Sequence, residues 1–386
     1  MRNGESIGGW IPNYYTARGM RVVYLSYSIP KPAFSDPGKW LKRIGFSVTV
    51  MEELAKYVEV EGIYHIAYRG KVRRNGVTYH FTNYRKWNVI FPIQFNRYIK
   101  ELRPDVVIVY GFSSPWQIIL LRWQVGSHLK IMIEHHADKP LRDIRQYFQR
   151  WADRYIHSYF FSSKELAMKW VEKRQIGDEQ KIKENAGTSS VFYSIDKNKA
   201  RSVIGFTEGK IFLWVGRLDF NKDPWLVVRA FERFARKIPD VQLLMIYSSA
   251  DAEIPEQDFV VFAGNKAIHF LGEVEHPRLL YYYNSADFIL STSHYESHGI
   301  AVIEGLSCGC IPILTGLPSF TKITNNGEIG FLYPPGDEDA LMGLLHRCLE
   351  LDLPTHRNRI LRYFKERLSS EAIAKNIVEN IRQATV

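Results

Sequence analysis

The chain has 386 residues, which is long enough for two domains with their own hydrophobic cores. A hydrophobic content of 46% and an aromatic content of 14% are typical of a globular protein and exclude a disordered one. No apolar run reaches the roughly 18 residues that a membrane span needs, and the first residues have no signal-peptide core. Three cysteines do not make a disulfide framework, so we expect a cytoplasmic protein.

The net charge of +10 is unevenly distributed. Residues 1–190 contain 30 Lys and Arg against 17 Asp and Glu (+13), whereas the rest of the chain contains 21 against 24 (−3). A basic first half suits a nucleic acid, an anionic membrane surface or an acidic acceptor. Segment 68–97 mixes cations with Trp87, Phe91 and Phe95, as surfaces that contact a membrane interface often do. An ordinary basic surface over a core that contains aromatic residues explains the segment equally well. No zinc-finger, RRM or helix-turn-helix signature is present, so we expect no nucleic-acid partner.

The first half of the chain alternates between expected strands and helices. Residues 1–20 are polar and contain glycines, and are expected to form a loose extension. The strand at 130–133 runs into Glu134, His135 and His136, and ligands bind at strand ends in open α/β sheets. The full pattern is strands at 21–26, 47–50, 63–68, 77–81, 105–110, 130–133 and 159–163, with helices at 39–44, 93–102, 113–123, 142–158 and 164–174.

The second half has a more regular alternation, which predicts a parallel, doubly wound sheet. The polar segment 185–196 has the character of an interdomain crossing, so we place the domains at 1–190 and 191–368. The chain ends in an amphipathic helix over 369–385. Expected strands lie near 211–215, 241–246, 260–263, 268–271, 288–291, 311–314 and 330–332, and expected helices near 225–237, 277–285, 300–309 and 337–350.

One stretch, 294–312, predicts a strand, a polar turn and a helix that begins near Gly299. The free backbone N–H groups of Gly299, Ile300 and Ala301 at a helix start suit an anion. Two carboxylates bracket this start, and a glutamate beside an anion site is better placed to accept hydrogen bonds from sugar or ribose hydroxyls. These are Glu296 and Glu304. A strand–turn–helix with two glutamates also occurs in many α/β proteins without such a site.

A second stretch, 210–224, favours the functional interpretation. It predicts a buried strand and a turn at Gly216, followed by Arg217 and Lys222. The rigid fork of an arginine and the compact charge of a lysine together suit a diphosphate, although either cation alone would more often belong to a solvated loop.

Together, the two stretches resemble the retaining, nucleotide-sugar-dependent glycosyltransferases of family 4, also called glycosyl transferases group 1. Gly216, Arg217, Leu218 and Lys222 match the G-R-L-x-x-x-K pattern of that family, and Glu296 and Glu304 match its E-x7-E motif. The resemblance covers about 187–365. It implies the GT-B fold: two Rossmann-like, doubly wound α/β domains facing a central cleft, with the last helix (369–386) crossing back to the first domain.

The resemblance also implies roles for individual residues. Glu304 would bind the ribose hydroxyls and Glu296 the hydroxyls of the donor sugar. Arg217, Lys222 and the helix-start amides would bind the diphosphate, so no metal is expected and the nucleotide sugar is a co-substrate. A histidine of the first domain, His136 or its neighbour His135, would reach the donor sugar. Gly272 and His298 are further donor-contacting candidates.

The sequence departs from the family pattern in three places. The first-domain loop 27–38 keeps only Gly38, Tyr247-Ser248-Ser249 stands in place of a glycine pair, and Lys322 in place of an acidic residue. Since the last two lie near the nucleotide, the base stays open between UDP and GDP types.

The resulting hypothesis is a retaining transfer of a sugar to a glycan, lipid-linked or small-molecule acceptor. The alternatives are a GT-B sugar-nucleotide epimerase or disaccharide synthase, a non-catalytic sugar-nucleotide-binding subunit, and a nucleic-acid binder. Peripheral contact of the basic first domain with the inner membrane face is left open.

Overall fold

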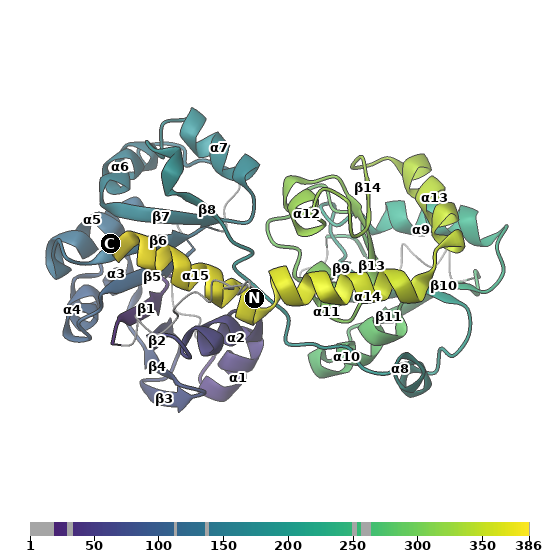
Figure 1. Cartoon of the computed structure of the whole chain (residues 1–386), viewed down its shortest axis with the longest axis horizontal. Helices are drawn as coiled ribbons and strands as arrows, with labels where there is room; N and C mark the ends of the chain where they lie inside the picture. Colours follow the sequence, from purple (N-terminus) through teal and green to yellow (C-terminus); the bar gives the residue numbers. More distant parts are fainter. Residues whose placement is uncertain are drawn as a thin grey trace, which may run out of the picture.

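The structure is a computed structural model that describes residues 19–28, 34–111, 114–135, 139–248, 253–255 and 264–385. Within these ranges the chain forms two α/β domains that lie side by side (Figure 1). The first is built around an eight-stranded sheet and the second around a six-stranded sheet. The two-domain, parallel-sheet architecture expected from the sequence is confirmed.

The first sheet has the order β3-β4-β2-β1-β5-β6-β7-β8. Its central strand β5 is buried along Val106–Val109, as in a parallel sheet covered on both faces. Only the β3–β4 pair of this described sheet is antiparallel, and its Asn75-Gly76 turn has the positive φ angles of a tight hairpin. The strands are β1 (Arg21–Leu25), β2 (Glu59–His65), β3 (Gly70–Arg74), β4 (Val77–Thr82), β5 (Val106–Tyr110), β6 (Lys130–Glu134), β7 (Ile156–Phe161) and β8 (Ile182–Glu184).

Helices cover both faces of this sheet, each over its own apolar core. One face carries α1 (Pro37–Arg43), α2 (Gly45–Leu54) and the C-terminal helix α15 (Ser370–Thr385), whose Ile373, Ile377 and Ile381 are buried in the first-domain core. The opposite core includes apolar residues of α4, α5 and α7. The remaining helices of the domain are α3 (Lys86–Ile90), α4 (Ile93–Glu101), α5 (Pro115–Val125), α6 (Arg145–Ala152) and α7 (Lys164–Glu172).

The second sheet is parallel throughout its described strands, in the order β11-β10-β9-β12-β13-β14. Counted along the domain, this is the 3-2-1-4-5-6 order of a doubly wound fold, with its switch point between β9 and β12. The strands are β9 (Lys210–Arg217), β10 (Val241–Ser248), β11 (Ile268–Gly272), β12 (Phe288–Ser291), β13 (Ile311–Thr315) and β14 (Phe331–Tyr333). The helices are α8 (Lys197–Ile204), α9 (Pro224–Ala235), α10 (His276–Ser285), α11 (Ile300–Ser307), α12 (Pro318–Ile323), α13 (Glu338–Arg347) and α14 (Leu353–Tyr363).

Several local expectations differ from the structure. The strand expected at 47–50 is part of helix α2, because Val48, Met51 and Leu54 lie on one helical face and pack into the core that α15 closes. The helix expected over 142–158 ends at Ala152, and strand β7 begins at Ile156. Helices α3, α8, α12 and α14 and strands β3 and β8 were not anticipated. The strand expected at 260–263 lies outside the described residues.

The chain crosses between the domains twice. On the first crossing, Ser189 N donates to Phe46 O (3.1 Å), and at the return Ser370 Oγ donates to Thr49 Oγ1 (2.8 Å). Helices α14 and α15 run in succession from the second domain onto the first (Figure 1). No described helix combines the length and the apolar character that a bilayer span requires.

Candidate functional site

A cavity of about 570 Å³ opens at the switch point of the second sheet. The carboxyl ends of β9, β10 and β12 form its floor, which is where doubly wound sheets bind their ligands. Most of its lining comes from the second domain, but Arg43 and Phe46 come from the first. The cavity therefore lies between the two domains.

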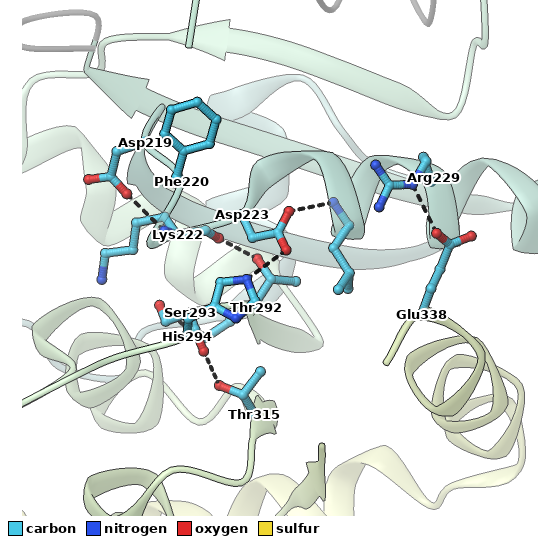
Figure 2. Close-up of polar contacts among 12 residues, drawn as sticks. Asp219, Phe220, Lys222, Asp223, Arg229, Thr292, Ser293, His294, Thr315 and Glu338 are labelled. Carbon is cyan, nitrogen blue, oxygen red and sulfur yellow. Dashed lines mark hydrogen bonds and ion pairs between the residues drawn. The ribbon is translucent and has the colours of Figure 1, made fainter. Parts of the chain in front are cut away.

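Two loops of the second domain, 218–223 and 292–296, form one wall of the cavity and are hydrogen-bonded to each other. His294 N donates to Asn221 O (2.8 Å), and Thr292 Oγ1 donates to Lys222 O (2.6 Å). Figure 2 shows the Thr292 contact, with Thr315 holding the carbonyl of Ser293 from the next strand (2.7 Å). These contacts fix the backbone of both loops, so the side chains that they carry start from defined positions.

Asp223 joins the same two loops through its side chain. Its backbone lies in the left-handed region (φ 42°), and its carboxylate accepts from the N–H of Leu226 (3.2 Å), capping helix α9. The other carboxylate oxygen lies 2.9 Å from His294 Nε2 (Figure 2). Asp223 therefore orients both helix α9 and the loop that carries Lys222.

Each of the two predicted cations contacts a carboxylate. Arg217 Nη2 lies 2.8 Å from Asp219, which is buried and also accepts from the backbone N–H of Lys222 (2.7 Å). Lys222 Nζ pairs with Glu296. The side chain of Arg217 is 60% exposed and that of Lys222 is 23% exposed, so an incoming anion can reach both cations.

Glu304 is held from the opposite side by helix α10. It is buried and accepts hydrogen bonds from Tyr283 Oη (2.8 Å) and His276 Nε2 (3.1 Å). The hydrogen bond to Glu304 raises the pKa of His276, and burial raises the pKa of Tyr283 well above its ordinary value. The carboxylate therefore faces the cavity in a fixed position, as recognition of a hydroxyl requires.

Helix α11 begins directly after Gly299, which lies on the cavity wall. Gly299 has φ 60°, and a Cβ added there would lie 2.6 Å from Phe320 Cε1, so both conformation and space demand glycine. No side-chain cap or acidic residue occupies the first turn. The backbone donors near Ile300 and Ala301, which line the cavity, are thus available to a ligand.

The structure brings most of the predicted site residues to this one cavity and leaves a few elsewhere. Eight of them line it: Gly216, Arg217, Lys222, Glu296, Gly299, Ile300, Ala301 and Glu304. Gly272 precedes the lining residue Glu273. His298 is buried and lines a neighbouring cavity together with Lys322 and Glu184, and burial lowers its pKa to about 4.

The histidine candidates of the first domain fare differently. His135 is not a cavity residue: its ring is 3% exposed and stacks on Phe161 (4.6 Å between centroids) with Trp170 against its edge (4.3 Å). The sequence signal failed here because a strand-end histidine can equally turn back into the core. His136 lies outside the described residues.

Several residues of the site and its supports were not found from the sequence. Arg43 and Phe46 come from helices α1 and α2, more than 150 positions earlier in the chain, and no local pattern links them to the site. Tyr283 lies on the helix expected at 277–285 and His276 just before it, but their spacing does not reveal which carboxylate they hold. Asp219 lies inside the matched motif, at a position that the motif leaves open.

A second cavity, of about 490 Å³, lies at the switch point of the first sheet, where β1 and β5 end. Its lining is mostly apolar and aromatic, and it shares Arg43 and Phe46 with the first cavity. Tyr24 Oη and Trp40 Nε1 are buried and have no hydrogen-bond partner among the described residues. The described residues hold no group of three or more His, Cys, Asp or Glu arranged for a metal ion.

Comparison with known proteins agrees with this geometry. Residues 196–367 match the family model of glycosyl transferases group 1. The chain is 30% identical over 150 residues to phosphatidyl-myo-inositol mannosyltransferase of Mycolicibacterium smegmatis, covering 38% of this chain and 37% of that protein. It is 27% identical over 164 residues to glycogen synthase of Mycobacterium tuberculosis, covering 41% and 38%. These matches thus span about two fifths of the length of the curated relatives.

Solved structures match over both domains. A glycosyltransferase from Rickettsia africae superposes with a TM-score of 0.72 at 17% identity, over 95% of this chain and 99% of that one. HepE of Anabaena, solved in complex with UDP, gives a TM-score of 0.69 at 14% identity, over 94% and 100%. Identities this low show the shared fold, which is GT-B. Residues 196–367, which span most of the second domain, thus match glycosyl transferases group 1, and the two domains together have the GT-B fold.

Proposed function

We propose that this protein transfers a sugar from a nucleotide diphosphate donor, bound in the cavity of the second domain, to an acceptor hydroxyl presented by the first domain. The observation that carries the proposal is a convergence within one cavity: two cations and an uncapped helix start for a diphosphate, with two glutamates for hydroxyls. The family of the second domain supports the same activity.

The chemistry follows from where charge develops. Breaking the bond between the sugar and the phosphate leaves negative charge on the departing diphosphate. Arg217, Lys222 and the amides at the start of α11 stabilise that charge more strongly as it grows, which lowers the barrier. We propose that these groups replace a metal ion and that the donor is the only co-substrate.

Lys222 and Glu296 form an ion pair in the cavity wall. When a diphosphate arrives, Lys222 can exchange its carboxylate partner for phosphate oxygens. Glu296 is then released to accept hydrogen bonds from the sugar hydroxyls, so we assign it a positioning role and not that of a nucleophile. Retention at the anomeric carbon is proposed from the family resemblance.

Glu304 supplies the matching contact for the ribose. Its two hydrogen bonds from helix α10 leave the carboxylate fixed before the nucleotide binds, which lowers the entropy cost of binding. HepE of Anabaena has been solved with UDP-glucose, and trehalose-6-phosphate synthase of E. coli with UDP-2-fluoro glucose. We therefore propose UDP-sugars as the first donors to test, with GDP-sugars second.

The first-domain cavity is the proposed acceptor site. It adjoins the donor cavity through Arg43 and Phe46, and its aromatic wall favours an acceptor with an apolar or ring-shaped part. Tyr24 Oη and Trp40 Nε1 offer unpaired donors for acceptor oxygens. A lipid-linked, glycan or small-molecule acceptor each meets this description.

Donor binding is the decisive experiment. Thermal-shift measurements with UDP, GDP and ADP should show stabilisation by one of the first two, because a ligand stabilises in proportion to the logarithm of its saturation. Turnover of the matching sugar nucleotide is then measured with and without acceptors. Isomerisation of the donor in the absence of an acceptor would replace the proposal with an epimerase, and tight binding with no turnover on any acceptor would replace it with a binding subunit.

The chain provides a matched control for the cations. Arg229 lies on helix α9 and pairs with Glu338 (2.9 Å) outside the cavity (Figure 2). Arg217→Ala should weaken donor turnover by about 10²–10³-fold, whereas Arg229→Ala should leave it unchanged. Equal turnover in the two variants would contradict the assignment of the diphosphate site.

A further inference from the structure

Helices α3 to α6 of the first domain carry a group of large hydrophobic side chains on their outer surface. Half of the exposed large hydrophobic residues of the described chain, 7 of 14, lie on or beside these four helices, and Trp87 (69%) and Trp123 (61%) are among the most exposed. We call this surface the aromatic face; it consists of Trp87, Phe91, Ile93, Trp123, Ile144, Tyr147 and Trp151.

These side chains form neighbouring contacts across the helices. Trp87 stacks on Phe91 with ring centroids 6.3 Å apart, and Trp123 meets Trp151 edge-on at 5.6 Å. Gln124, next to Trp123, donates to the carbonyl of Ile93 (3.2 Å), which ties α5 to α4. The aromatic face therefore continues from α3 across α5 to α6.

The aromatic face is not an unfinished part of the core. The same helices already bury a separate apolar side against the sheet, through residues such as Phe95, Ile99 and Leu121. Helices α4, α5 and α6 lie on the side of the first domain that points away from the second (Figure 1). The outer side chains thus project from a complete domain, and an exposed apolar surface of this kind marks an interaction site.

The charges around the aromatic face are almost all positive. The four helices carry six cations (Lys86, Arg97, Lys100, Arg122, Arg145 and Arg150) and a single acidic residue, Glu101; Asp143, beside Ile144, pairs with Arg145 (3.5 Å). Ile93, Arg97 and Lys100 follow one another along one side of α4, so apolar and cationic groups share that side. Arg150 lies over the ring of Tyr147 at 5.6 Å.

We propose that the aromatic face docks on the surface of an anionic phospholipid bilayer. Tryptophan and tyrosine prefer the depth of the lipid headgroups, where the ring is apolar and its polar atom stays hydrated. Each nearby Lys or Arg adds attraction to anionic lipid, on the order of 1 kcal/mol. A protein–protein interface would contain fewer lysines than this surface, and the aliphatic Ile93 and Ile144 could not stack on the bases of a nucleic acid. The proposal stands independently of the sugar-transfer function.

The test is co-sedimentation of the full chain with phosphatidylcholine vesicles, prepared with and without phosphatidylglycerol. We expect binding to the anionic vesicles alone, and weaker binding as salt is added. The double variant Trp87→Ala/Trp123→Ala should bind at least about tenfold more weakly, since each buried ring contributes more than 1 kcal/mol. The double variant Lys86→Glu/Arg97→Glu should weaken binding to the anionic vesicles by a similar factor.

Matched controls come from exposed residues elsewhere. Tyr193→Ala removes an aromatic ring that is 62% exposed outside the aromatic face, and Lys237→Glu/Arg359→Glu reverses two exposed charges on the second domain. These controls should bind anionic vesicles like the parent chain. Unchanged thermal unfolding of every variant separates lost binding from lost folding.

Three results would overturn the proposal. The first is a failure of the parent chain to bind anionic vesicles. The second is an equal loss of binding in control and test variants. The third is a concentration-dependent dimer, seen by sedimentation equilibrium, that Trp87→Ala/Trp123→Ala abolishes, because the aromatic face would then be a contact between two copies of the chain.

Discussion

The two cavities of this molecule occupy equivalent places in two sheets and differ in the number of charged side chains in their walls. Each lies at the switch point of its sheet, beyond the carboxyl ends of the strands. In the second domain the wall carries charged side chains that already have partners, such as Lys222 with Glu296. In the first domain the wall is mainly aromatic, and Tyr24 and Trp40 leave polar atoms unpaired there among the described residues. The fold determines where in each domain a ligand binds, and the side chains of the cavity wall determine which ligand binds there.

The difference has a physical reason. A diphosphate carries fixed charge, so its site needs cations and amides in fixed positions, and the two cross-linked loops provide them. An acceptor offers a hydroxyl on a body of variable shape, so its site can consist of apolar surface with few polar anchors. Arg43 and Phe46 line both cavities, so the proposed donor site and the proposed acceptor site are adjacent.

The strongest test of this comparison is removal of the charge that faces the diphosphate. Lys222→Ala should lower kcat/KM by about 10²–10³-fold, or about 2.7–4 kcal/mol of transition-state stabilisation. Donor hydrolysis without an acceptor should fall by the same factor, because the charge acts on the leaving group. A loss confined to the reaction with acceptor would place Lys222 on the acceptor side and break the comparison.

The start of helix α11 gives the second test. Gly299→Ala forces a left-handed alanine against Phe320, so the free energy of unfolding should fall by about 2–4 kcal/mol, with loss of donor binding. Gly205→Ala is the control, because Gly205 has φ 79° but no atom within 4 Å of the added carbon. Gly205→Ala should lower the free energy of unfolding by only about 1–2 kcal/mol, and denaturant unfolding measures the loss in both variants. Equal costs would mean that Phe320 moves aside freely.

The polar cavity could largely be predicted from the sequence, for reasons that Gly299 and Lys222 illustrate. Each lies in a short segment that joins a strand to a helix, and the periodicity of strand and helix places that segment at the sheet edge. The partners of the predicted residues could not be found in this way. Tyr283 reaches Glu304 from a helix 21 positions away, and only tertiary packing selects it.

The apolar cavity shows the opposite result. One of its wall helices, α2, was expected to contain a strand at 47–50, because the run from Ser47 to Val50 is rich in β-branched residues. The helical packing of this run against α15 depends on the far end of the chain. The alternation of the surrounding strands was sufficient for the fold. The aromatic lining of this cavity could not be distinguished from core by sequence alone.

The third test addresses that aromatic lining. Trp40→Ala should raise the acceptor KM by about tenfold, since a stacked indole contributes about 1–1.5 kcal/mol, and should leave donor affinity unchanged. Isothermal titration of the nucleotide and steady-state kinetics with varied acceptor separate the two. A parallel loss of donor affinity would indicate that the two cavities act as one site.

The smallest expected effect concerns the pH dependence of the polar wall. The hydrogen bond to Glu304 raises the pKa of His276 above its ordinary 6.5. A raised folded-state pKa means that the protonated imidazole stabilises the fold fully below 6.5 and that this contribution disappears as pH rises through the folded value. Because the imidazole is 54% exposed, solvent screening should keep the contribution under about 1 kcal/mol.

The measurement is the difference in unfolding free energy between the parent chain and His276→Gln from about pH 5.5 to 8.5, the range in which imidazoles titrate. The difference should be largest at low pH and shrink as pH rises. His346→Gln is the control, because the described contacts of His346 include the ring of Phe234 at 5.1 Å but no carboxylate. This variant shows the effect of removing an imidazole that does not contact Glu304. Parallel profiles would mean that screening cancels the charge of His276, so that Tyr283 alone holds Glu304 at the cavity.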